Sequence, residues 1–189
     1  MKRFGWMVLG MSVSFILVNS QAVRGEGAAS AAQYMGSETC AKMCHKTAKQ
    51  GEQLRLWQES SHAKAFEVLG TDAAKAIGKK MGIDDPQKSD KCLPCHTTAH
   101  GVAADKLQAT YSPTEGVGCE RCHGPGSDYK KMAVMKDRKQ AVAAGLLLPN
   151  EKTCLQCHNE KSPTYKPFKY DERVKKIAHK KPEAAPAGG

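Results

Sequence analysis

The stretch Cys92-Leu93-Pro94-Cys95-His96 has two cysteines separated by two residues, and a histidine directly follows the second cysteine. Two further stretches have this form, Cys119–His123 and Cys154–His158, and a fourth, Cys40–His45, has three residues between its cysteines. Together the four stretches contain all eight cysteines of the chain. Cys-x-x-Cys-His is the attachment sequence of a c-type haem, in which the thiols bond to the porphyrin and the imidazole ligates the iron. The sequence therefore predicts four covalently bound haem c groups.

Each predicted haem has two attachment cysteines and one proximal histidine. The cysteines are Cys40 and Cys44, Cys92 and Cys95, Cys119 and Cys122, and Cys154 and Cys157, and the proximal ligands are His45, His96, His123 and His158. A disulfide framework and structural zinc sites are the alternative interpretations, but neither needs a histidine after every cysteine pair. The first stretch has three residues between its cysteines, so attachment through Cys44 alone is a further alternative.

Three histidines lie outside the attachment sequences, and the second axial position of each iron gives them a role. We expect His62, His100 and His179 to be distal iron ligands, which makes three haems bis-histidine and leaves one without a second histidine. Since His100 follows His96 by four residues, it would ligate a neighbouring haem more easily than its own. The remaining iron would have methionine, water or no sixth ligand. The candidate methionines are alternatively packing residues against porphyrin: Met43, Met81, Met132 and Met135.

The N-terminus has the pattern of an export signal. Lys2 and Arg3 precede an apolar run over residues 4–18, and Ser20-Gln21-Ala22 is a small-residue cleavage site. We expect a signal peptide at 1–22, a flexible lead at 23–36, a tetrahaem cytochrome domain at 37–181 and a disordered tail at 182–189. Because haem attachment to thiols takes place outside the cytoplasm, the protein is predicted to be periplasmic or otherwise exported. The alternative is an uncleaved membrane anchor, and without one we expect no stable membrane insertion.

The composition predicts a single domain that is mostly α-helical, with much irregular loop, wrapped around four stacked haems. The chain has only four phenylalanines and two tryptophans, too few large apolar residues to fill a core without the porphyrins. The apolar pattern and the turn residues predict helices over 47–69, 71–80, 127–144 and 171–180. We expect the haem-free chain to be largely unfolded.

The charge of the chain favours protein partners over nucleic acid. The net charge is +10, and removal of residues 1–22 takes away Lys2 and Arg3 and lowers it to +8. Haem propionates offset much of this charge, and export also argues against nucleic acid. We expect lysine clusters to steer redox-partner proteins that have acidic docking patches, although each is alternatively a solvated helix face: Lys130–Lys131, Lys175–Lys176 and Lys180–Lys181. The sequence does not predict an oligomeric state.

Three segments of the chain resemble one family. They are Trp57–Ala65, with its Ser-Ser-His-Ala-Lys-Ala run, the glycine-flanked third attachment sequence Gly116–Gly126, and Tyr170–Lys175 followed by His179. They resemble the tetrahaem cytochromes c that accept electrons from hydroxylamine oxidoreductase in nitrifying bacteria, the cytochrome c554 family. The resemblance extends over residues 36–180.

The resemblance implies closely stacked haems in a mostly helical fold, His62 and His179 as distal ligands, and one five-coordinate haem. This chain departs from the family in two places, and both affect which haem is five-coordinate. The family has a histidine after the Gly-Pro-Gly turn, where this chain has residues 129–135 without one, and this chain has His100 where the family's open haem lies. If His100 replaces the missing ligand, the haem of His96 stays open. If His100 binds that haem instead, the haem of His45 is open or methionine-ligated.

The predicted chemistry favours an electron carrier over an enzyme. Closely spaced haems pass electrons to one another without a substrate pocket, so we expect a periplasmic relay between redox partners. One alternative is reduction of nitric oxide, nitrite or hydroxylamine at an open haem, with Asp84, Asp85 or His100 as candidate proton donors. A second alternative is a subunit of a stacked-haem filament or conduit.

Overall fold

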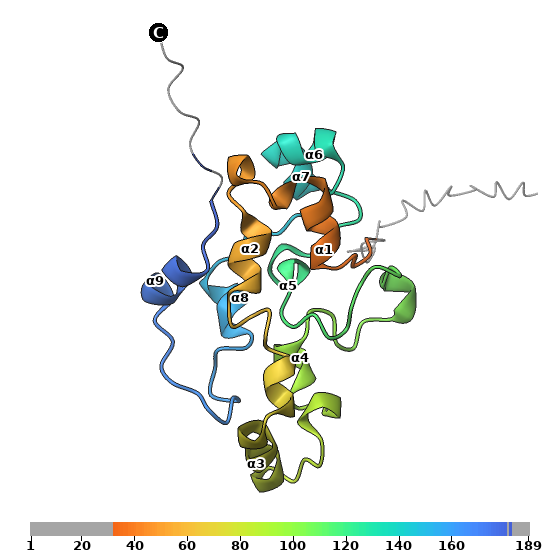
Figure 1. The fold of residues 1–189 in the computed structure, drawn as a ribbon. Coiled ribbons are helices and arrows are strands. Elements are labelled where there is room, and N and C mark those ends of the chain that lie inside the picture. The colour runs from red at the N-terminus through yellow and green to blue at the C-terminus, as the bar shows by residue number, and fades with distance from the viewer. Residues whose placement is uncertain (1–31, 181, 183–189) are drawn as a thin grey trace, which may run out of the picture.

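The computed structural model describes residues 32–180 and 182, so the predicted signal peptide, most of the predicted lead and nearly all of the predicted tail lie outside the described residues. The described part is made of short helices joined by irregular loops (Figure 1). This confirms the predicted mostly helical fold class. The α-helices are α1 (Ser37–Cys40), α2 (Gln53–Gln58), α3 (Asp72–Lys80), α4 (Leu93–His96), α5 (Cys119–His123), α6 (Met132–Lys136), α7 (Arg138–Ala143), α8 (Glu151–Leu155) and α9 (Tyr170–Arg173).

Shorter helical turns connect these helices. The segment Ala41–His45, named η1, is a π-helix, and the 3₁₀ turns are η2 (Ala48–Gln50), η3 (Glu67–Gly70), η4 (Pro86–Lys88), η5 (Ala104–Lys106) and η6 (Val174–Lys176). The extended pairing in the described residues is a single bridge between Tyr34 and Leu107. None of the described helices is both long and apolar enough to cross a membrane.

Two of the predicted helices are interrupted in the structure. The segment 47–69 breaks after η2, where Gly51 and Glu52 both have positive φ angles, 101° and 49°. The segment 127–144 divides at Asp137, whose carboxylate accepts hydrogen bonds from the N–H groups of Lys139 and Gln140 and so starts α7. The helix predicted at 71–80 is confirmed as α3, with Thr71 as its N-cap.

The described residues bury few large apolar side chains. The buried apolar residues include only Met35, Leu69, Ile83, Val117 and Tyr129 besides five alanines. By contrast, Leu147 is 57% exposed and Leu148 is 48% exposed, and both follow α7. The described residues therefore do not form a conventional hydrophobic core. This agrees with the expectation that large apolar groups complete the interior.

A buried carboxylate holds the N-terminal segment against α5, which lies near the middle of the molecule in Figure 1. Glu120 of α5 is 2% exposed and accepts hydrogen bonds from the N–H groups of Met35, Gly36 and Gly126 at 2.7–3.0 Å. Burial raises the pKa of this carboxyl group, and the three N–H groups oppose the shift. Since Gly36 and Gly126 flank the first and third attachment sequences, Glu120 fixes these two sequences relative to each other.

Candidate haem-attachment sites

The cysteine thiols of different attachment sequences lie next to one another in two pairs. The Cys40 and Cys119 thiols form a hydrogen bond, which raises the pKa of Cys40 and lowers that of Cys119. Burial, together with a hydrogen bond to Cys157, raises the pKa of Cys95 to about 11. The first attachment sequence therefore adjoins the third, and the second adjoins the fourth. All eight cysteines are partly buried, and no disulfide joins any two of them.

The extra residue of the first attachment sequence lies in the π-helix η1. A π-helical turn inserts one residue into an α-helical path, so Ala41–His45 takes up the longer spacing between Cys40 and Cys44 within one turn. Cys40 is the last residue of α1 and Cys44 lies inside η1. Both thiols thus belong to one continuous helical segment.

The structure brings two pairs of histidine rings close together, with the ring planes inclined at 55° and 66°. The ring centroids of His62 and His158 are 6.1 Å apart, and those of His123 and His179 are 6.0 Å apart. An imidazole nitrogen binds a first-row metal ion at about 2.0–2.1 Å, so two imidazoles on opposite sides of one ion have centroids roughly 6 Å apart. The spacing of both pairs therefore fits an iron ion between the rings.

Backbone carbonyl groups orient several of these imidazoles. The Nδ1 atoms of His96, His123 and His179 lie 2.6, 3.1 and 2.9 Å from the carbonyl oxygens of Ala65, Leu147 and Ile177. A ring whose Nδ1–H donates to a carbonyl has its lone pair on Nε2, which is the form that ligates a metal ion. The fold therefore presents Nε2 of these three rings as a ligand atom.

His62 and His158 are held by different contacts. The carbonyl of His62 accepts a hydrogen bond of 2.9 Å from the N–H of Val117, whose own carbonyl accepts one of 2.8 Å from the Trp57 indole. The His158 ring stacks on Phe168, with centroids 4.7 Å apart. Burial lowers the pKa of both histidines, which favours the neutral imidazole that a metal ion requires.

The other three histidines are not joined to a second histidine ring. His100 is exposed, and its Nε2 lies 3.1 Å from Oδ1 of Asp90. Neither His45 nor His96 faces another imidazole among the described residues, which include all seven histidines. The role predicted for His100 as an iron ligand thus stays a prediction.

The chain is similar to known c-type cytochromes. A family model described as cytochrome c554 and c-prime matches residues 39–124. Cytochrome c-554 of Nitrosomonas europaea is 29% identical over 186 residues, which cover 81% of this chain and 77% of that protein. The chain is therefore similar to the cytochrome c554 family. This similarity supports a c-type cytochrome that carries electrons on covalently bound haem c. No solved structure matches it significantly.

Two residues that sequence reasoning missed lie between the cysteines of the third attachment sequence. Glu120 is the buried carboxylate described above, and Arg121 has its Nη2 atom 3.7 Å from Sγ of Cys157. The sequence contained a signal for both residues, because two adjacent charged residues lie between the cysteines of one attachment sequence. A charged side chain that is buried there needs a polar partner. Which partners they find depends on the tertiary fold.

Proposed function

We propose that this cytochrome is a periplasmic tetrahaem protein that relays electrons between redox-partner proteins. Its four attachment sequences would each hold one haem through two thioether bonds and a proximal histidine. The bound haems supply one-electron redox centres. The observation that supports the proposal most strongly is the pairing of His158 with His62 and of His123 with His179 at 6.1 and 6.0 Å, the separation suited to two axial ligands of one iron.

The contacts between attachment sequences suggest an order of neighbouring sites. The Cys40–Cys119 contact joins the first and third sequences, and the Cys95–Cys157 contact joins the second and fourth. Arg121 in turn connects the third sequence with the fourth. We infer a continuous path through all four sites, which is what a relay requires.

The surface charges support protein partners. Lys131, Lys175, Lys176 and Lys180 are exposed, whereas Lys181 lies outside the described residues. Exposed lysines attract acidic docking patches and increase the rate of encounter. By its family, we propose that the donor is a protein of the hydroxylamine oxidoreductase type, reached after export through the signal peptide at 1–22.

Counting haems and electrons tests the proposed function. We expect the purified holoprotein to show four haems by intact mass and by pyridine haemochrome absorbance, and to take up four electrons per chain in a reductive titration. Fewer than four haems would contradict the tetrahaem assignment. Free thiols after denaturation would identify an attachment cysteine that carries no thioether, with Cys40 as the first to check.

A second candidate function is reduction of a small nitrogen compound such as nitric oxide or hydroxylamine. The observation that favours it is that His45 and His96 have no second imidazole opposite them, so their irons would keep a position for a ligand other than histidine. Steady consumption of nitric oxide by the reduced holoprotein would support this activity. Electron uptake without such turnover would support the carrier alone.

A further inference from the structure

Arg121 lies where three attachment sequences meet. It belongs to α5, within the third sequence, and its guanidinium Nη2 is 3.7 Å from Sγ of Cys157 in the fourth sequence. Cys157 is also in contact with the second sequence, because its thiol bonds with Cys95 and its Sγ lies 4.0 Å from the carbonyl oxygen of Pro94. A single positive charge is therefore adjacent to three of the four sites.

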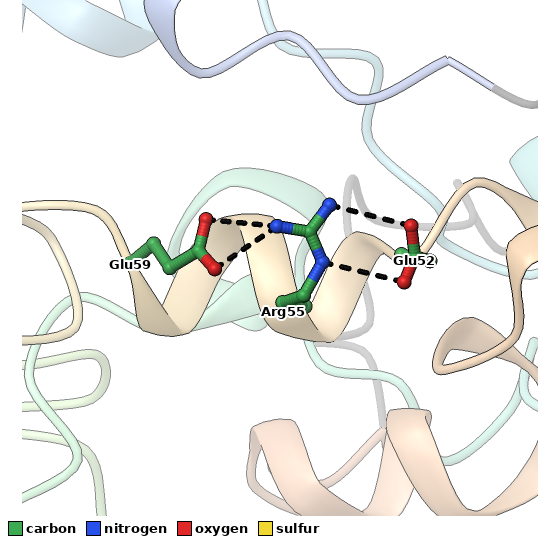
Figure 2. A network of polar contacts seen from close by, with 3 residues as sticks. All are labelled: Glu52, Arg55 and Glu59. Atoms are coloured by element: carbon green, nitrogen blue, oxygen red, sulfur yellow. Dashed lines mark hydrogen bonds and ion pairs between the residues drawn. The ribbon is translucent and has the colours of Figure 1, made fainter.

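The charge of Arg121 is not balanced by a carboxylate in the described part of the chain. The neighbouring carboxylate of Glu120 bonds instead to the N–H groups of Met35, Gly36 and Gly126. Arg55 of α2 shows the opposite situation, because its guanidinium lies between Glu52 and Glu59 on the exposed face of the helix (Figure 2). Arg121 is also partly buried, so salt screens its charge less than that of an exposed arginine.

The guanidinium of Arg121 lies against the second and fourth attachment sequences. Its Nη2 atom contacts Sγ of Cys157, and that sulfur in turn contacts the carbonyl oxygen of Pro94. A positive charge stabilises the reduced form of a nearby haem, because reduction removes one positive charge from the iron.

We propose that the Arg121 guanidinium raises the reduction potentials of the haems at the second and fourth attachment sites. The inference rests on the proposed function, since it requires haems at these sites. It gives Arg121 the role of making these two haems better electron acceptors within the relay. The arginine side chain would thereby help to set the direction of electron flow through the protein.

Arg121→Gln removes the charge and keeps a side chain of similar polarity. A unit charge roughly 10 Å from an iron, at an effective dielectric constant of about 20, changes an equilibrium constant by about tenfold. We therefore expect the reduced-to-oxidised ratio of at least one haem, at a fixed electrode potential, to fall about tenfold, which is about 59 mV for a one-electron couple. A potentiometric titration with a four-centre fit measures it.

Two further variants separate charge from structure. Arg121→Lys keeps the charge and should leave all four potentials within a twofold change of that ratio. Arg138→Gln removes a positive charge from the exposed start of α7 and should also leave them unchanged. The proposal is overturned if Arg121→Gln changes the ratio less than twofold, or if the lysine and glutamine variants shift it equally. A haem count of four in every variant would still support the proposed function, whether or not the potentials change.

Discussion

At the scale of single residues, the site depends on which ring nitrogen each histidine offers. The backbone carbonyls of Ala65, Leu147 and Ile177 engage Nδ1 of three histidines and so leave Nε2 to the iron. The proximal histidines could be read from the sequence, because each directly follows a cysteine pair. Their partners could not, since the partners of His158 and His123 are 96 and 56 residues away in the chain.

Removal of His62 tests one of these pairs. We expect His62→Ala to convert one haem equivalent from low-spin to high-spin in the oxidised holoprotein, because His158 would then ligate its iron alone. The haem count should stay at four, since His62 is not part of an attachment sequence. Low-temperature EPR of the oxidised protein measures the change.

His100→Ala is the matched control for this variant. Because His100 is exposed and bonds to Asp90, we expect its loss to leave the spin states unchanged. The pairing is contradicted if His62→Ala keeps the wild-type spectrum, or if His100→Ala produces the larger conversion to high spin.

At the scale of elements, short helices are positioned by close backbone contacts rather than by broad apolar faces. Thr98, which follows the second attachment sequence, accepts a hydrogen bond of 2.8 Å from the N–H of Gly118 and donates one of 3.0 Å to the carbonyl of Gly116. The N–H of Val117 binds the carbonyl of His62. The segment 116–118 thus joins the second and third attachment sequences to His62, the predicted distal ligand. Sequence patterns predicted α3 well, because neighbouring residues in the sequence determine where this helix begins and ends. They did not predict the helix breaks at Gly51 and Asp137.

A substitution at Gly116 tests this role. Gly116 has a φ of +80°, and a Cβ atom there would lie 2.5 Å from the carbonyl oxygen of His62. We expect Gly116→Ala to lower the free energy of unfolding by more than about 2 kcal/mol, because left-handed strain adds to a backbone collision. Denaturant unfolding of the holoprotein, followed by circular dichroism, measures the loss.

Gly101→Ala separates these two causes. Gly101 has a similar φ of +76°, but nothing lies within 4 Å of its added Cβ, so this variant should lose only about 1 kcal/mol. We also expect only Gly116→Ala to displace His62 and to increase high-spin iron. Equal losses of stability in the two variants would show that Gly116 does not position the distal histidine.

At the scale of the whole molecule, the described chain surrounds its attachment sites without a large apolar interior of its own. Leu69 and Ile83 are buried, whereas Leu147 and Leu148 beside His123 are exposed. The composition made this shortage predictable, because four phenylalanines and two tryptophans cannot fill an interior of this size. The cysteine and histidine spacing predicts that haems fill this interior. The neighbour relations of the four sites depend on tertiary contacts and could not be predicted.

The shortage of apolar interior predicts that the fold depends on its haems. We expect the chain produced without haem, and kept reduced so that disulfides do not form, to be largely unfolded. Its amide proton signals in NMR should have narrow dispersion, and its helical circular dichroism should be well below that of the holoprotein. A cooperative thermal transition of the haem-free chain would contradict this expectation.

The measurement that tests the central claim most directly is near-infrared magnetic circular dichroism of the oxidised holoprotein, with haem quantified on the same sample. The charge-transfer bands distinguish bis-histidine haems from haems with another sixth ligand. The pairs His62–His158 and His123–His179 predict that two of the four haems are bis-histidine. Fewer than two would show that a pair does not share an iron. Three would show that His100 leaves Asp90 to bind a third iron, against the arrangement in this structure.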